Sequence, residues 1–108
     1  RGDAVPDVAS EAFKDYAFVS DGTVASFTVV TSGGSSGDSD MHIFAPGVVP
    51  AFDAANFTYT NFVCRPWDVG SDEICTINTP AAGTYRIRFY NYPDAGVLSG
   101  MQATLTHP

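Results

Sequence analysis

The sequence predicts an all-β protein, an antiparallel β-sandwich with jelly-roll-like topology and about eight strands. Two observations predict this fold class. Residues 84–90 and 101–106 alternate between apolar and polar side chains, which is the two-residue period of a strand with one buried face. Turn-forming residues punctuate the chain at intervals of about ten residues, and no segment shows a credible helical period.

The first third of the chain supplies two expected strands. Residues 1–14 have no clear period and are interpreted as a lead-in, so the domain is expected to span residues 15–108. Residues 15–20 form the first strand, and Asp21-Gly22 is a strong hairpin signal. Residues 23–31 form the second strand, with Phe27 and Val29 on the same face.

The middle of the chain holds a third strand and a long connection. Residues 32–39 are rich in glycine and serine and are expected to form a loop. Residues 40–45 form the third strand, which Pro46-Gly47 ends. Residues 48–62 are interpreted as a long connection, with one short strand around residues 59–63. This connection contains four aromatic residues for which the sequence predicts no structural or binding role: Phe52, Phe57, Tyr59 and Phe62.

The last third of the chain supplies the most regular strands, at residues 74–78, 84–90 and 101–106, with a turn at residues 80–83. Residues 84–90 and 101–106 alternate, which separates an inward from an outward face in these two strands. The predicted core combines the apolar residues that share inward faces: Phe18, Phe27, Val29, Met41, Ile43, Tyr85, Ile87, Phe89, Met101 and Leu105.

Composition and charge restrict the possible functions. The chain has 108 residues, enough for a single core, and a formal net charge of −7. Because such a surface repels phosphates and anionic lipids, we expect no nucleic-acid partner and no membrane partner. We also expect a monomer. The opening Arg1-Gly2-Asp3 lacks the form of a signal peptide, so we expect the sequence to be a piece of a longer protein.

The two cysteines, Cys64 and Cys75, allow two readings. As free thiols they would indicate a reducing compartment, whereas a disulfide would indicate an oxidising one. A disulfide over this short loop would stabilise the fold by about 3 kcal/mol in the loop-entropy model. A zinc site is improbable, because neither His42 nor His107 has ligand spacing. We favour the disulfide.

Four separate motifs occur in one order along the chain. They are Gly37-Asp38-Ser39-Asp40-Met41-His42 after a glycine-rich loop, Cys64-Arg65-Pro66-Trp67, Glu73-Ile74-Cys75, and Ala82-Gly83-Thr84-Tyr85. In this order the chain resembles the bacterial pre-peptidase C-terminal domain, a small β-sandwich appended to exported proteases. Met41 and His42 replace a leucine and a tyrosine of that family's motif, and residues 47–62 match no pattern of the family.

The resemblance implies a non-catalytic accessory domain of a secreted bacterial peptidase, with the catalytic domain outside this sequence. The domain would either bind insoluble protein substrate or assist export and maturation. Its partners would be the parent peptidase domain in cis and an insoluble protein such as collagen. The residues themselves agree, because they contain no nucleophile elbow and no zinc-protease helix, so no catalytic residue is expected.

Acidic residues suggest calcium as the one possible cofactor, although none is required. Two groups could offer the oxygen ligands that calcium prefers: Asp38 and Asp40, and Asp68, Asp72 and Glu73. The alternatives, which we favour, are a turn fixed by Asp40 bonding nearby backbone N–H groups and an ordinary solvated acidic loop.

Aromatic and arginine side chains are the candidates for substrate binding. Trp67 lies inside the cysteine loop, where it could anchor a partner or fold back over one end of the sandwich. The outward face of residues 84–90 and the following stretch carry a possible polar-aromatic patch of Arg86, Arg88, Tyr90 and Tyr92. An ordinary solvated sheet face is the simpler interpretation of that patch, and we favour it.

Two other classes of function share this fold class. A jelly-roll carbohydrate-binding module would stack sugars on Trp67, Tyr90 and Tyr92. A calcium-gated structural linker would gain thermal stability from calcium.

Overall fold

The computed structural model describes residues 2–4, 12–33, 39–66, 73–91 and 101–107. These residues form nine strands and no helix, so the all-β class is confirmed. The strands are β1 (Gly2–Ala4), β2 (Phe13–Ser20), β3 (Ser26–Ser32), β4 (Ser39–Phe44), β5 (Phe52–Asp53), β6 (Thr58–Tyr59), β7 (Ile74–Asn78), β8 (Gly83–Asn91) and β9 (Gln102–Thr106). No helix of the described residues is long and apolar enough to cross a membrane.

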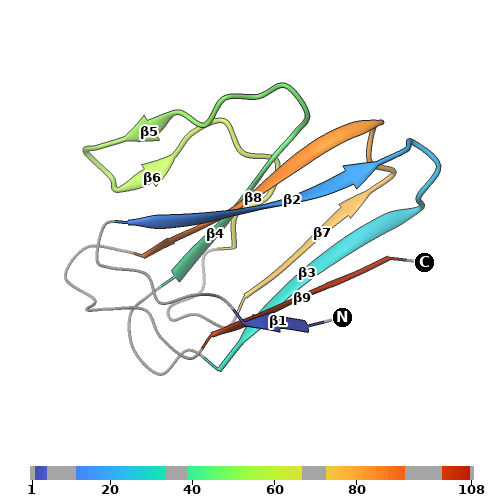
Figure 1. Cartoon of the computed structure of the whole chain (residues 1–108). Coiled ribbons are helices and arrows are strands. Elements are labelled where there is room, and N and C mark those ends of the chain that lie inside the picture. The colour runs from blue at the N-terminus through green and yellow to red at the C-terminus, as the bar shows by residue number, and fades with distance from the viewer. Residues whose placement is uncertain (1, 5–11, 34–38, 67–72, 92–100, 108) are drawn as a thin grey trace.

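The strands form two layers and a separate small hairpin (Figure 1). One sheet has the order β1-β9-β3-β7 and the other has the order β2-β8-β4, while β5 pairs only with β6. Every recorded strand pairing is antiparallel. The antiparallel sandwich that the sequence predicts is therefore confirmed. Gly2–Ala4, within the stretch interpreted as a lead-in, pairs with β9.

The expected hairpin at Asp21-Gly22 is wrong. β2 pairs with β8 and β3 pairs with β7 and β9, so the turn between β2 and β3 carries the chain from one sheet to the other. The Asp21 carboxylate accepts hydrogen bonds from the backbone N–H and the hydroxyl of Thr23, at 2.8 and 2.6 Å. The same Asp-Gly sequence is found in hairpin turns and in turns that an aspartate side chain fixes. Which of the two forms here depends on the distant strands with which β2 and β3 pair.

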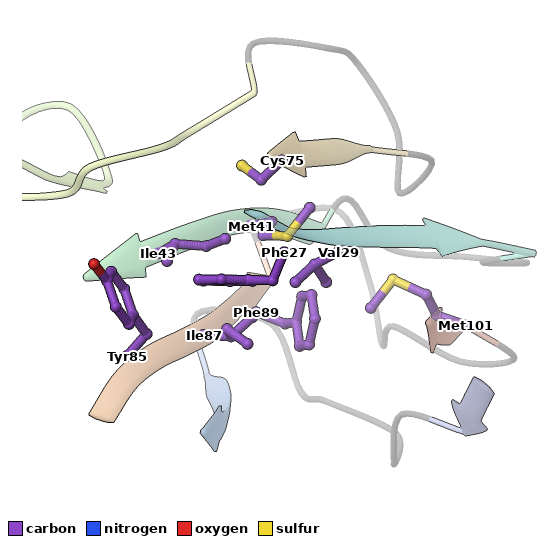
Figure 2. Packing of buried hydrophobic residues seen from close by; sticks show 9 residues of the cluster. All are labelled: Phe27, Val29, Met41, Ile43, Cys75, Tyr85, Ile87, Phe89 and Met101. Carbon is purple, nitrogen blue, oxygen red and sulfur yellow. The ribbon is translucent and has the colours of Figure 1, made fainter. Parts of the chain in front are cut away.

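The main core lies between the two sheets (Figure 2). Eight of the predicted core residues are buried there, and Phe18 and Leu105 pack against them at the margin. Cys75 joins the buried cluster from β7. Phe27 contacts Phe18 and Tyr85, with ring centroids 4.4 and 5.2 Å apart, and so links strands of both sheets.

The Cys64–Cys75 disulfide is present and joins the two layers along one side of the sandwich. Cys75 belongs to β7, the edge of the four-stranded sheet, while Cys64 forms a bridge with Ile43 of β4, the edge of the other sheet. The amide of Ile43 donates to the carbonyl of Cys64 at 2.9 Å. The covalent bond therefore links two sheet edges that no strand pairing connects.

Residues 45–62, here called the covering segment, fold over the outer face of the three-stranded sheet (Figure 1). They contain the β5–β6 hairpin, where the sequence suggested a strand around residues 59–63. Phe57, with a φ of 51°, is the last residue of the turn at residues 54–57 that closes this hairpin. Hydrogen bonds within the segment support it: Asp53 accepts from Ala55 and Asn56, and Asn61 bridges to Ala51 and Val49.

A second cluster fills the space beneath the covering segment. Phe44, Tyr59 and Tyr90 are buried there, and Val48, Phe57 and Phe62 pack around them. All six residues of β4 are buried as a result, because both faces of this strand are covered. Nothing in the sequence of residues 48–62 predicts this packing role for its aromatic residues.

Candidate functional site

Five of the ten residues predicted to bind substrate or calcium lie outside the described part of the chain. These are Asp38, Trp67, Asp68, Asp72 and Tyr92. The structure places the remaining candidates Asp40, Glu73, Arg86, Arg88 and Tyr90. An exposed Trp67 and calcium binding by the two acidic groups therefore stay predictions.

Asp40 and Glu73 each make a polar contact with another segment of the chain. The Asp40 carboxylate is buried and lies 3.6 Å from the guanidinium of Arg65. Glu73 is buried too, and its Oε1 accepts the backbone N–H of Met41 at 2.7 Å. Glu73 also exchanges hydrogen bonds with Thr31, at 2.9 Å in each direction. Through these contacts both carboxylates join β4 to neighbouring segments.

Among the described residues, no group of three or more histidine, cysteine, aspartate or glutamate side chains is arranged to hold a metal ion. The carboxylates of Asp40 and Glu73 are used in contacts within the protein instead.

The predicted patch of Arg86, Arg88 and Tyr90 is not a solvent-facing surface. Tyr90 is 2% exposed and Arg88 is 8% exposed, because the covering segment lies over them. A sugar or protein chain could not stack on Tyr90 in this arrangement, which also removes one of the three platforms of the carbohydrate-binding alternative. Only Arg86, with 47% of its side chain exposed, remains open to solvent.

The outer face of β2, β8 and β4, over which the covering segment lies, is here called the covered face. Arg88 lies at its centre, on the middle strand β8. Its Nε and one Nη donate to the two oxygens of Asp15 at 2.7 and 2.8 Å, an arrangement that fixes both planes. The guanidinium carbon also lies 3.7 Å from the Phe13 ring centroid and 5.1 Å from that of Tyr59. The buried cation is thus satisfied by one carboxylate and two aromatic faces.

Arg86 shares the same carboxylate, because its Nη1 donates to Asp15 at 2.9 Å. Burial raises the pKa of Asp15, but the hydrogen bonds and charges of Arg88 and Arg86 together hold this pKa below its ordinary value of 3.8. The three side chains carry two positive charges and one negative charge. They form a local cationic group on a strongly acidic chain.

His42 occupies the covered face beside Arg88 and is fully buried. Its Nε2 lies 3.1 Å from the hydroxyl of Thr58, and its ring contacts Phe44, Tyr59 and Phe62. Burial, and next the charge of Arg65, lower its pKa from 6.5 to about 4. A histidine closed off in this way cannot reach a substrate, so it serves the packing of the covering segment.

The outer face of the four-stranded sheet differs in character. Thr106, Thr28 and Thr76 stand side by side in register across β9, β3 and β7, and Thr104, Val30 and Ile74 form the next row. The hydroxyls of Thr28 and Thr76 are 3.0 Å apart. We call these six residues the threonine face. β3, β7 and β9 contain no lysine, arginine, aspartate or glutamate.

The threonine face is not predicted by the sequence. Alternation identifies the outward positions of residues 23–31 and 101–106, but the sequence does not show which strands are neighbours. The rows exist only because β3 lies between β7 and β9 in the sheet order.

Three comparisons place this chain among known proteins. The family model of the bacterial pre-peptidase C-terminal domain matches residues 14–91. A neutral protease of Vibrio proteolyticus is 34% identical over 74 residues, which are 68% of this chain and 11% of that protease. The chain therefore spans only a small part of the length of this relative.

A likeness among solved structures extends to the whole fold. The crystal structure of Aeromonas hydrophila PliG, a periplasmic lysozyme inhibitor of g-type lysozyme, superposes with a TM-score of 0.70 at 18% identity. The match covers 99% of this chain and 86% of that chain, so the two share a fold. Since the family model covers most of the sequence, the chain belongs to the bacterial pre-peptidase C-terminal domain family.

Proposed function

We propose that this chain is a non-catalytic accessory domain of a secreted bacterial peptidase, and that its threonine face binds insoluble protein substrate. Family membership and the neutral-protease relative support the accessory role. The observation that carries the binding role is the threonine face itself, a surface of uncharged side chains across three strands, of which Val30, Ile74, Thr76 and Thr106 are exposed and Thr28 and Thr104 are half-buried.

The charge and the shape of the threonine face both suit adhesion. A chain with a net charge of −7 repels acidic surfaces at long range, so an adhesive face has to be free of that charge. Threonine side chains offer a methyl group and a hydroxyl at fixed spacing, since β-branched side chains are stiff. Little side-chain entropy is therefore lost when an extended surface packs against them.

Fibrous protein is the occupant that this surface fits best. Exposed Ile74 and Val30 supply apolar area, while the surrounding hydroxyls can exchange hydrogen bonds with backbone groups of a partner. An insoluble partner presents many repeated sites, so weak contacts at each domain are sufficient for retention.

Retention on insoluble collagen tests the proposal. Ile74→Glu places a charge on the threonine face at its most exposed aliphatic residue, on edge strand β7, and Val19→Glu introduces a glutamate at an exposed position of β2, on the other sheet. We expect the wild type and Val19→Glu to be retained equally and Ile74→Glu to be retained several-fold less. Equal loss in both variants, or no retention of the wild type, would contradict the proposal.

A further inference from the structure

An open cleft of about 550 Å³ lies on the side of the molecule opposite the threonine face. Ala17 and Thr84 lie along it from β2 and β8, and Val48 and Val49 line it from the covering segment. Val49 is strongly exposed, although it is a large aliphatic residue. The cleft therefore combines apolar walls with free space beside a strand.

Arg86 lines the same cleft and has hydrogen-bonding capacity left over. Asp15 is already engaged by two donors of Arg88 and receives only one further hydrogen bond, from Nη1 of Arg86. The described residues offer the guanidinium of Arg86 no other hydrogen-bond partner. Its remaining N–H groups are thus available to an acceptor that enters the cleft.

The fixed charges around the cleft favour an anion. Arg86, Arg88 and Asp15 sum to one positive charge, and Arg88 is held in place by Phe13 and Tyr59. Among the residues that the structure describes, Asp15 and Arg86 are the charged side chains that line the cleft. A carboxylate beside Arg86 would complete an alternating arrangement of two guanidinium groups and two carboxylates.

We propose that this cleft binds the C-terminal carboxylate of a peptide that ends in an apolar residue. Arg86 pairs with the carboxylate, and Val48, Val49 and Ala17 contact the terminal side chain. The planar guanidinium matches a carboxylate, and the apolar walls select against small inorganic anions, which have no side chain to bury. This site goes beyond the proposed function and lies on a different face, so each can fail without the other.

The experiment titrates the folded chain with two probe peptides, acetyl-Gly-Gly-Leu with a free C-terminus and the same peptide with a C-terminal amide, followed by backbone amide shifts. We expect saturable shifts at Thr84 and Val49 with the free acid, and about tenfold weaker binding of the amide, as for loss of one charged hydrogen-bonded contact. Equal binding of acid and amide would overturn the proposal.

Matched variants separate the site from net charge. Arg86→Gln and Lys14→Gln remove one positive charge each, but only Arg86 lines the cleft. We expect Arg86→Gln to weaken binding of the free acid about tenfold, Lys14→Gln to leave it unchanged, and Arg86→Lys to lie between them. Equal weakening by the two glutamine variants, or inorganic phosphate competing as well as the peptide, would overturn it.

Discussion

The outer face of β2, β8 and β4 carries large aromatic and charged side chains, whereas the outer face of β3, β7 and β9 carries threonine and short aliphatic ones. Both faces arise from the same alternating pattern. The first is covered by residues 45–62, and Tyr90 and Phe44 are buried beneath them. The second is open to solvent, and Ile74 is 59% exposed.

This difference shows what alternation in a sequence can and cannot reveal. Alternation identifies the side chains that avoid the main core, but solvent is only one of the environments that they can face. Arg88 is an outward residue by its period and a buried one by its surroundings. The size of the outward side chains is the better indicator here, since only the covered face contains aromatic rings at several adjacent positions.

The largest expected effect comes from removing a ring from the covered face. Phe44→Ala should lower the free energy of unfolding by about 3–5 kcal/mol, because Phe44 is fully buried and its loss leaves a cavity. Ile74→Ala on the threonine face should change it by less than about 1 kcal/mol, since this side chain is largely exposed. Urea unfolding of both variants measures the difference. Similar losses would mean that the covering segment contributes no second core.

Acid should weaken the covered face through His42. Its pKa is about 4 in the folded protein and 6.5 as the ordinary value, so between these pH values the unfolded chain binds a proton that the folded chain does not. Stability should therefore be constant above pH 6.5 and should fall between pH 6.5 and pH 4, by about 3 kcal/mol in total. Urea midpoints measured across this range test the expectation.

Two substitutions isolate the titration of His42 from its packing. His42→Phe keeps an aromatic ring among Phe44, Tyr59 and Phe62 but removes the titrating group, so the slope between pH 4 and pH 6.5 should flatten. Thr58→Val removes the hydroxyl that lies 3.1 Å from Nε2 and should leave the slope in place. A slope that survives in His42→Phe would have to come from other groups, and the assignment to His42 would be wrong.

Much of the fold follows from the sequence, and much of the site does not. The strict alternation of Tyr85, Ile87 and Phe89 identifies core positions because every second residue of β8 faces the other sheet. The turn at Asp21-Gly22 was assigned to the wrong type of connection, because pairing of β2 with β8 depends on residues more than sixty positions away. Both the threonine rows and the Arg86 cleft depend on neighbours that only the folded chain brings together.

The smallest expected effect tests how closely the covering segment approaches the sheet. Gly83 begins β8 with a φ of +132°, and a Cβ at this position would lie 2.7 Å from the Cβ of Pro46, at the start of the covering segment. Gly83→Ala should therefore lower the free energy of unfolding by about 2–3 kcal/mol, from backbone strain and overpacking together.

Gly47 also has a positive φ, of +78°, but a Cβ there would meet nothing within 4 Å. Gly47→Ala should cost only the backbone term, about 1 kcal/mol. Chemical unfolding of the two alanine variants separates these contributions. If Gly83→Ala lowers the free energy of unfolding no more than Gly47→Ala does, the close approach of Pro46 to β8 is not needed for stability. The covering segment would then pack more loosely on the sheet than the structure shows.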